Sequence, residues 1–186
     1  RDTLINMNAT GDPTPTARFM GGREFDRMVE GAKSATPSEV RIVLNERVML
    51  FPSLEKGSGP FQETTASWAA REPAAPGERY AAASFYCSLM TATCLELIGA
   101  DGPIIVEGPF AANELYLGML AAACGRPVAT GAGSVTGTAI GAAMLANCAG
   151  RNPVPQPRRN SGSIYMGAFQ EYLTLWRAKV AARPAS

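Results

Sequence analysis

The residues whose types and spacing best suit chemistry lie between positions 104 and 120, in the run IIVEGPFAANELYLGML. The pattern predicts a buried strand that ends at Gly108 and a helix that follows it directly. A glycine here lets a ligand approach the main chain, and the start of the helix offers N–H groups to an anion. Ligands of open α/β sheets lie at the carboxyl ends of strands. A tight turn without a ligand also needs Gly108, so the pattern leaves both interpretations open.

A second glycine-rich run, GAGSVTGTAIG at positions 131–141, does not fit a dinucleotide site. It lacks GxGxxG, and the first acidic residue after Glu114 is Glu171, far beyond the spacing of about twenty residues that the fingerprint requires. Gly137 and Gly141 are better explained as positions where a helix packs closely on a sheet. The order KGS at positions 56–58 likewise does not make a Walker A loop.

The absence of histidine removes several kinds of site at once. Ser-His and Cys-His pairs, a histidine base and zinc sites with imidazole ligands are all excluded. No CxxC pair occurs among the cysteines, and two of them lie seven residues apart on a predicted helix, about 10 Å from each other, too far for a disulfide. We expect free thiols in a reducing, cytoplasmic compartment at all four positions: Cys87, Cys94, Cys124 and Cys148.

Charged side chains give little support for a metal site or a nucleic-acid interface. The chain has 17 Lys and Arg against 16 Asp and Glu, so no net positive field would attract nucleic acid. We expect Arg18 and Arg23 to form ion pairs rather than to bind an anion. Four carboxylates are expected to be solvated or salt-bridged rather than metal ligands: Asp12, Glu24, Asp26 and Glu107.

Elements alternate along the chain in the way typical of a layered α/β domain. The uncharged stretch 127–150 is too rich in Ala, Gly, Thr and Ser to predict a membrane span. We expect the strand at 103–107 to be covered on both faces and to neighbour the strand at 126–129. The final helix should pack through its aromatic stripe. The expected helices are 23–30, 36–45, 78–98, 111–123, 136–148 and one after 163; a further strand is expected at 47–51, and loops at 52–77 and 151–163.

Three segments together resemble a known family. The runs VEGPFAANELYLGMLAAACGRPV and TGTAIGAAMLA are similar to the C-terminal domain of FGGY-family carbohydrate kinases, and NATGDPTPTARFMGGREF resembles a bacterial subgroup of these enzymes. The resemblance implies an actin-like, ribonuclease H-like ATPase domain, an α/β fold with a mixed sheet and helices on both faces. Residues 1–150 would form most of the nucleotide-side domain. Residues 151–186 would form a Pro-rich linker and an amphipathic helix that packs on that domain.

The resemblance also implies an adenine-nucleotide site. The family has a Gly-Gly-Ala-x-x-Asn turn, and its asparagine contacts adenine. Pro109 departs from this pattern because it has no N–H, and Phe110, in place of a small residue, would crowd or stack on the base. The implied site residues are Gly108, Pro109, Phe110 and Asn113 in the turn, with Thr138 and Gly141 in the helix behind it.

The implied parent reaction transfers the γ-phosphate of MgATP to a hydroxyl of a small sugar or polyol. The catalytic aspartate would belong to an N-terminal domain outside this chain, and the phosphate hairpin would lie just before Arg1. No catalytic residue and no metal ligand is then expected here, and the chain alone should be inactive. Two alternatives stay open: a non-catalytic α/β binding module, and a non-kinase member of the actin-like superfamily. The oligomeric state is also open, with a homodimer as one option.

Overall fold

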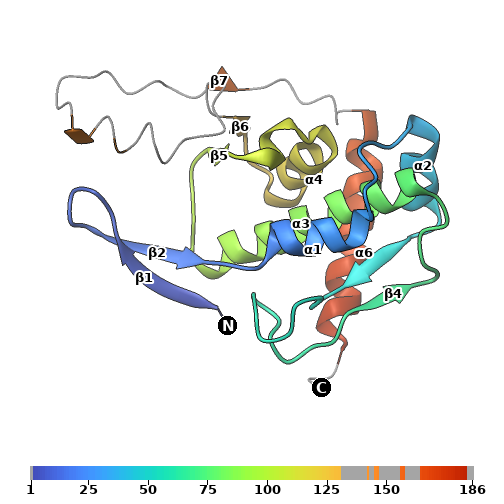
Figure 1. The fold of residues 1–186 in the computed structure, drawn as a ribbon, viewed down its shortest axis with the longest axis horizontal. Helices are drawn as coiled ribbons and strands as arrows, with labels where there is room; N and C mark the ends of the chain where they lie inside the picture. The colour runs from blue at the N-terminus through green and yellow to red at the C-terminus, as the bar shows by residue number, and fades with distance from the viewer. Residues whose placement is uncertain (1, 131–141, 143–144, 147–155, 158–163, 184–186) are drawn as a thin grey trace.

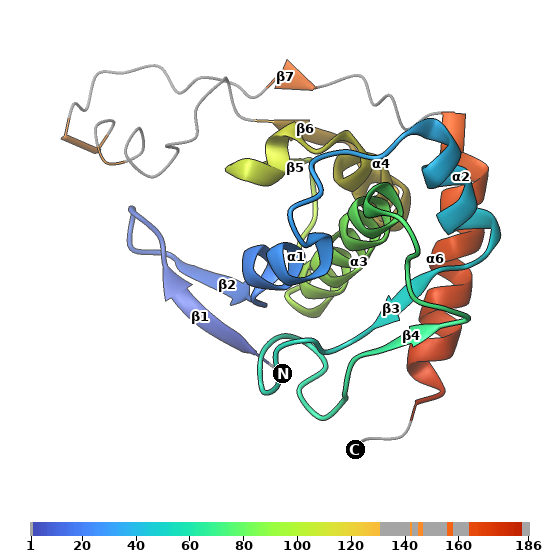
Figure 2. The same ribbon diagram turned by 45° about the vertical axis from the view of Figure 1, so that its right-hand side comes forward.

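A central helix organises the fold. The computed structural model describes residues 2–130, 142, 145–146, 156–157 and 164–183. Helix α3 (Pro76–Leu97) lies in the middle, and side chains on all its sides are buried, as the sequence predicted. Figures 1 and 2 show α1, α4 and α6 around it. The other elements are β1 (Thr3–Met7), β2 (Pro13–Ala17), α1 (Gly21–Val29), α2 (Pro37–Asn45), β3 (Met49–Phe51), β4 (Ser67–Ala69), β5 (Ile104–Val106), the 3-10 helix η1 (Pro109–Ala112), α4 (Glu114–Cys124), β6 (Val128–Thr130), β7 (Gln156–Pro157) and α6 (Met166–Ala181).

The described strands form three small sheets rather than one. Strands β1 and β2 make an antiparallel hairpin that extends away from the helices, and β3 pairs antiparallel with β4. The third sheet is mixed, because β6 pairs parallel with β5 and antiparallel with β7. The prediction that β5 and β6 are neighbours is therefore confirmed. Two strands were missed, since β4 and β7 lie in segments predicted as loops.

One expectation about β5 is wrong. The run Ile104–Val106 was expected to be covered on both faces, but Ile105 is 51% exposed while its two neighbours are buried. A continuous apolar run does not by itself show which face of a strand is covered, because the covering helices come from distant parts of the chain. Among the described strands, β5 is thus the half-exposed edge of its sheet.

Helix α6 attaches to the rest of the fold through the predicted aromatic stripe. Phe169, Tyr172 and Trp176 are buried, and both Phe169 and Tyr172 contact Phe85 of α3 edge-on. The Tyr172 hydroxyl donates to the Val48 carbonyl at 2.9 Å, and the Trp176 indole N–H donates to the Leu50 carbonyl at 2.9 Å. Each ring therefore buries its apolar surface while its polar atom is satisfied by main chain at β3.

The starts of α2 and α3 interlock. Thr36 and Glu39 form the predicted capping box at the start of α2. Gly77, in the first turn of α3, lies so close to the Glu39 carboxylate that a Cβ atom there would overlap it. A side chain at position 77 would therefore have to displace the Glu39 carboxylate from the capping box.

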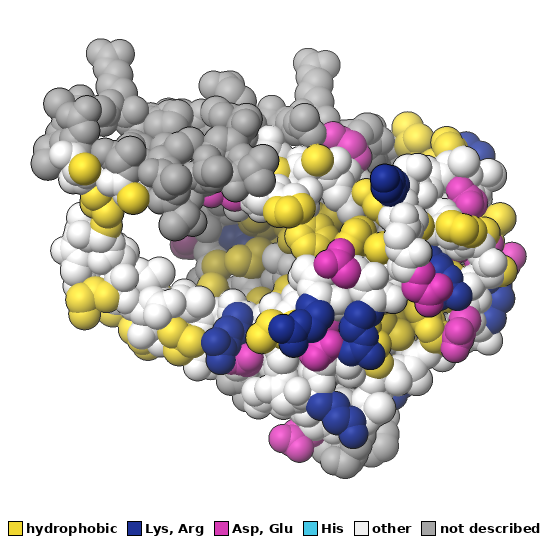
Figure 3. All heavy atoms as spheres, in the orientation of Figure 1, with side chains coloured by type: hydrophobic (Ala, Val, Ile, Leu, Met, Phe, Trp, Pro, Cys, Tyr) yellow, Lys and Arg dark blue, Asp and Glu magenta, His cyan; other side chains and the backbone are white. Residues whose placement is uncertain are grey.

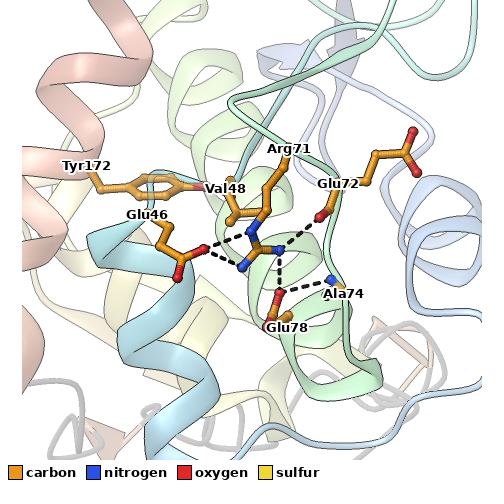
Figure 4. Close-up of polar contacts among 7 residues, drawn as sticks. All are labelled: Glu46, Val48, Arg71, Glu72, Ala74, Glu78 and Tyr172. Atoms are coloured by element: carbon orange, nitrogen blue, oxygen red, sulfur yellow. Dashed lines mark hydrogen bonds and ion pairs between the residues drawn. The ribbon is translucent and has the colours of Figure 1, made fainter.

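An arginine in the loop before α3 joins three segments (Figure 4). Arg71 donates to Glu46 at the end of α2, to Glu78 in the first turn of α3, and to the Glu72 carbonyl, at 2.7, 2.7 and 2.8 Å. Burial alone would raise the pKa of Glu78, but hydrogen bonds from Arg71 and from the Ala74 N–H hold it below its ordinary value. The loop predicted at this place is therefore fixed by charge-assisted hydrogen bonds.

No helix among the described residues is long and apolar enough to cross a bilayer.

Candidate functional site

The candidate site begins at Gly108, directly after β5. Its φ of 75° and ψ of −162° lie in a region that essentially only glycine occupies. A Cβ atom added there would meet nothing within 4 Å. Glycine is therefore required by the backbone angles and not by crowding, and the space beside Gly108 is open to an approaching group.

Asn113 lies at the junction between η1 and α4. Here the structure differs from the predicted helix at 111–123, because a 3-10 turn comes first and α4 begins at Glu114. Asn113 is the N-cap: its Oδ1 accepts from the Tyr116 N–H at 3.0 Å, and its Nδ2 donates to Ser84 Oγ at 2.9 Å. The residue is 5% exposed. Its amide thus has two partners inside the chain, and the adenine contact stays a prediction.

A row of hydroxyl groups connects α3 to α4 behind the turn. Ser84 Oγ donates to the Tyr80 carbonyl, and Ser88 Oγ lies 2.9 Å from the Tyr116 carbonyl. The Tyr116 hydroxyl bonds Thr91 Oγ1 at 3.0 Å, and burial raises the pKa of Tyr116 to about 12. Sequence reasoning missed these residues. Two serines four positions apart in the buried middle of α3 were the available signal.

Phe110 belongs to an aromatic cluster that joins the turn to α1. Its ring lies 5.2 Å from Phe25 of α1, edge-on, and 4.7 Å from Tyr116 of α4. Phe25 also contacts Tyr80 edge-on at 5.6 Å. Figure 3 shows a hollow between the β1–β2 hairpin and the body of the molecule, with hydrophobic side chains on its wall. Pro109 is exposed, and Phe110 is half-buried. The turn is therefore held by aromatic contacts and still reaches the surface.

The remaining predicted site residues have different positions. Thr138 and Gly141 lie outside the described residues, as does nearly all of the predicted helix 136–148. Of the four carboxylates expected to be solvated or paired, Asp26 and Glu107 are exposed, and Asp12 lies in the hairpin turn, where the Thr10 hydroxyl lowers its pKa. The same expectation for the fourth carboxylate, Glu24, is wrong.

Glu24 is the exception, because it is fully buried in α1 and its carboxylate bonds the Tyr86 hydroxyl of α3. The expected ion pairs are present, Arg18 with Asp2 at 2.8 Å and Arg23 with Glu55 at 3.9 Å. Within the described part of the chain, no group of three or more side chains of ligand type could hold a metal ion.

The thiols agree with the prediction wherever the structure describes them. Cys87, Cys94 and Cys124 are free, and Cys148 lies outside the described residues. Burial raises the pKa of all three, that of Cys94 to about 11.

Comparison with known proteins decides the family. Residues 1–155 match the family described as carbohydrate kinase FGGY, C-terminal domain. The chain belongs to the FGGY carbohydrate kinase family. The crystal structure of a carbohydrate kinase from Novosphingobium aromaticivorans is similar to it, with a TM-score of 0.82 and 32% sequence identity. The match covers 98% of this chain and 40% of that kinase, so the FGGY domain spans well under half of its relative. No curated protein matches the chain.

The fold prediction is confirmed by the same structural match, because the domain has the α/β architecture of an actin-like ATPase. The family membership predicted from the turn and helix motifs is confirmed as well.

Proposed function

We propose that the parent protein is an ATP-dependent sugar kinase and that this chain forms the adenine-nucleotide side of its cleft. The observation that carries the proposal is the turn at Gly108. It follows β5 at the carboxyl end of two parallel strands, where ligands of α/β proteins lie, and the space beside Gly108 is open. Membership of a carbohydrate kinase family supports the reaction class.

The turn residues would line one side of the nucleotide site. Gly108 lets the main chain approach, Pro109 offers no N–H, and Phe110 adds an aromatic edge. Asn113 holds the turn by capping α4, and its amide retains one N–H and one lone pair for adenine. We also propose Thr138 and Gly141, which lie outside the described residues, as residues of the nucleotide site.

The reaction would move the γ-phosphate of ATP to a hydroxyl of a small sugar or polyol, giving ADP and a phosphate ester. Positioning and charge neutralisation dominate such transfers, with Mg²⁺ held largely by the phosphates. We propose that the general base that takes the hydroxyl proton belongs to the part of the parent that this chain does not include. Free thiols and the family support a cytoplasmic protein.

Direct binding tests this proposal. Calorimetry should show that the protein binds ATP, and that Gly108→Val weakens binding at least tenfold, about 1.4 kcal/mol. The control is Gly22→Ala, which adds a Cβ in open space within α1. Val at position 108 also strains the backbone by about 1–3 kcal/mol, so its melting curve is recorded alongside. The proposal fails if ATP does not bind, or if both variants bind it as tightly as the wild type.

A second candidate, a non-catalytic α/β binding module, is favoured by one observation. The Asn113 amide already bonds the Tyr116 N–H and the Ser84 hydroxyl without any ligand, so it has a structural role in the turn. This candidate predicts no ATP binding. A non-kinase member of the actin-like superfamily would bind ATP, but the parent would show no sugar-dependent ADP release across a panel of sugars and polyols.

A further inference from the structure

Glu24 is an unusual residue for its position. It lies on α1, is 0% exposed, and accepts a hydrogen bond at Oε2 from the Tyr86 hydroxyl of α3. Its other oxygen, Oε1, has no hydrogen-bond partner in the described part of the chain. An ionised carboxylate in this environment would lose the solvation of one whole oxygen, which is far more costly than burying a neutral acid.

The charges around Glu24 do not favour its ionised form, because the effect of Glu55 on its pKa exceeds the opposing effect of Arg27. From α3 the neighbours are Tyr86 and Cys87, and from the segment after β3 they are Glu55 and the main chain of Leu54. Arg27 lies on the same helix as Glu24, but its guanidinium pairs with Glu55 at 2.5 Å.

These neighbours determine the charge state. Burial raises the pKa of Glu24, and the negative charge of Glu55 raises it further. The hydrogen bond from Tyr86, the main chain of Leu54 and the positive charge of Arg27 oppose this in part, and the net direction is upward. Burial also holds the pKa of Tyr86 well above its ordinary value, so the phenol stays neutral. Burial thus favours the protonated form of Glu24 beside a neutral phenol.

The helix that carries Glu24 also supports the candidate site. Phe25 follows Glu24 in the chain, and its ring packs edge-on against Phe110 of the turn at 5.2 Å and against Tyr80 at 5.6 Å. The Glu24–Tyr86 bond fixes α1 on α3, and α1 in turn holds Phe25 against Phe110.

We propose that Glu24 is a positioning residue that carries a proton in the folded protein, and that its ionisation loosens α1 and the Gly108–Asn113 turn. The inference does not depend on nucleotide binding, because it concerns a proton and the geometry of the turn.

The sign of the pH effect follows from linkage. A group whose pKa is raised by folding stabilises the protein fully below its ordinary pKa, and this contribution is lost as the pH rises through the folded-state value. Glu24→Gln keeps an acceptor for Tyr86 and nearly the same shape, but it cannot ionise. Between the ordinary pKa of a glutamate and the folded-state pKa of Glu24, the unfolding constant of the wild type should rise by up to tenfold per pH unit relative to that of Glu24→Gln, and above the folded-state pKa the ratio should be constant.

The experiment compares urea unfolding of the wild type and Glu24→Gln between about pH 4 and pH 9, a range that begins near the ordinary pKa of a glutamate. Asp26→Asn, an exposed acid on the same helix, is the control and should follow the wild type. The amide resonances of Gly108 and Ala111 report on the turn. They should shift with pH in the wild type and in Asp26→Asn, and stay fixed in Glu24→Gln.

A ratio of unfolding constants that does not change with pH would overturn the proposed protonation. A changing ratio with turn resonances that titrate identically in all three proteins would overturn the link to the turn. If Glu24→Gln does not fold, carbon-13 carboxyl resonances of the wild type decide: one glutamate titrating well above the others supports the proposal, and none doing so refutes it. Failure to bind ATP bears only on the proposed function.

Discussion

Asn113→Ala separates the two roles that Asn113 could have. The substitution removes the N-cap bond to the Tyr116 N–H, typically about 1 kcal/mol, and the bond to Ser84 Oγ, about 1 kcal/mol more. Ser84 keeps its own bond to the Tyr80 carbonyl, whereas the Tyr116 N–H loses its acceptor. The total of about 2 kcal/mol corresponds to a melting temperature about 4–8 °C lower for a domain of this size.

The assay is thermal unfolding followed by circular dichroism, with two matched variants. Asn113→Ser keeps a capping oxygen and loses the bond to Ser84, while Ser84→Ala loses that bond and leaves the turn intact. Each variant should lower the melting temperature by about 2–4 °C, half the decrease expected for Asn113→Ala. A melting temperature for Asn113→Ala within about 1 °C of wild type would refute the capping geometry.

The same three variants test the adenine contact in the parent enzyme. A lost hydrogen bond to the base should raise the KM for ATP by about 2- to 13-fold, the equivalent of about 0.5–1.5 kcal/mol. Ser84→Ala should leave that KM unchanged. An unchanged ATP KM in Asn113→Ala, together with the lower melting temperature, would assign Asn113 to the helix cap alone.

Two further predictions follow from close packing and burial. Gly77→Ala should lower the melting temperature, because the added Cβ displaces the Glu39 carboxylate. Gly22→Ala, at the same position of its own helix but in open space, should stabilise the protein by about 0.4–1 kcal/mol. Equal melting temperatures of the two variants would contradict the close approach of the helix starts. Alkylation followed by mass spectrometry should label Cys124 before Cys87, because Cys87 is fully buried and burial holds its pKa well above the ordinary value; rapid labelling of Cys87 in the native protein would show that α3 opens.

The sequence by itself determined the features that depend on near neighbours. The capping box at Thr36 and Glu39 involves residues three apart, and the aromatic stripe of α6 repeats at helical spacing. Gly108 was identified because a strand–turn–helix sequence requires special backbone angles at one position, and the structure has them. The family motifs around this turn are also contiguous, so they were readable without coordinates.

Only the tertiary structure decided the environment of each polar group. Glu24 looked like a surface acid, but its partner Tyr86 is 62 residues away, and Asn113 meets Ser84 across 29 residues. Strand pairing is equally non-local, which is why three small sheets and the exposed side of Ile105 were not predicted. Burial and hydrogen bonding depend on which distant segments fold together, and the free energy of a charge depends on both. The turn could therefore be located from the sequence, while the groups that hold it could not.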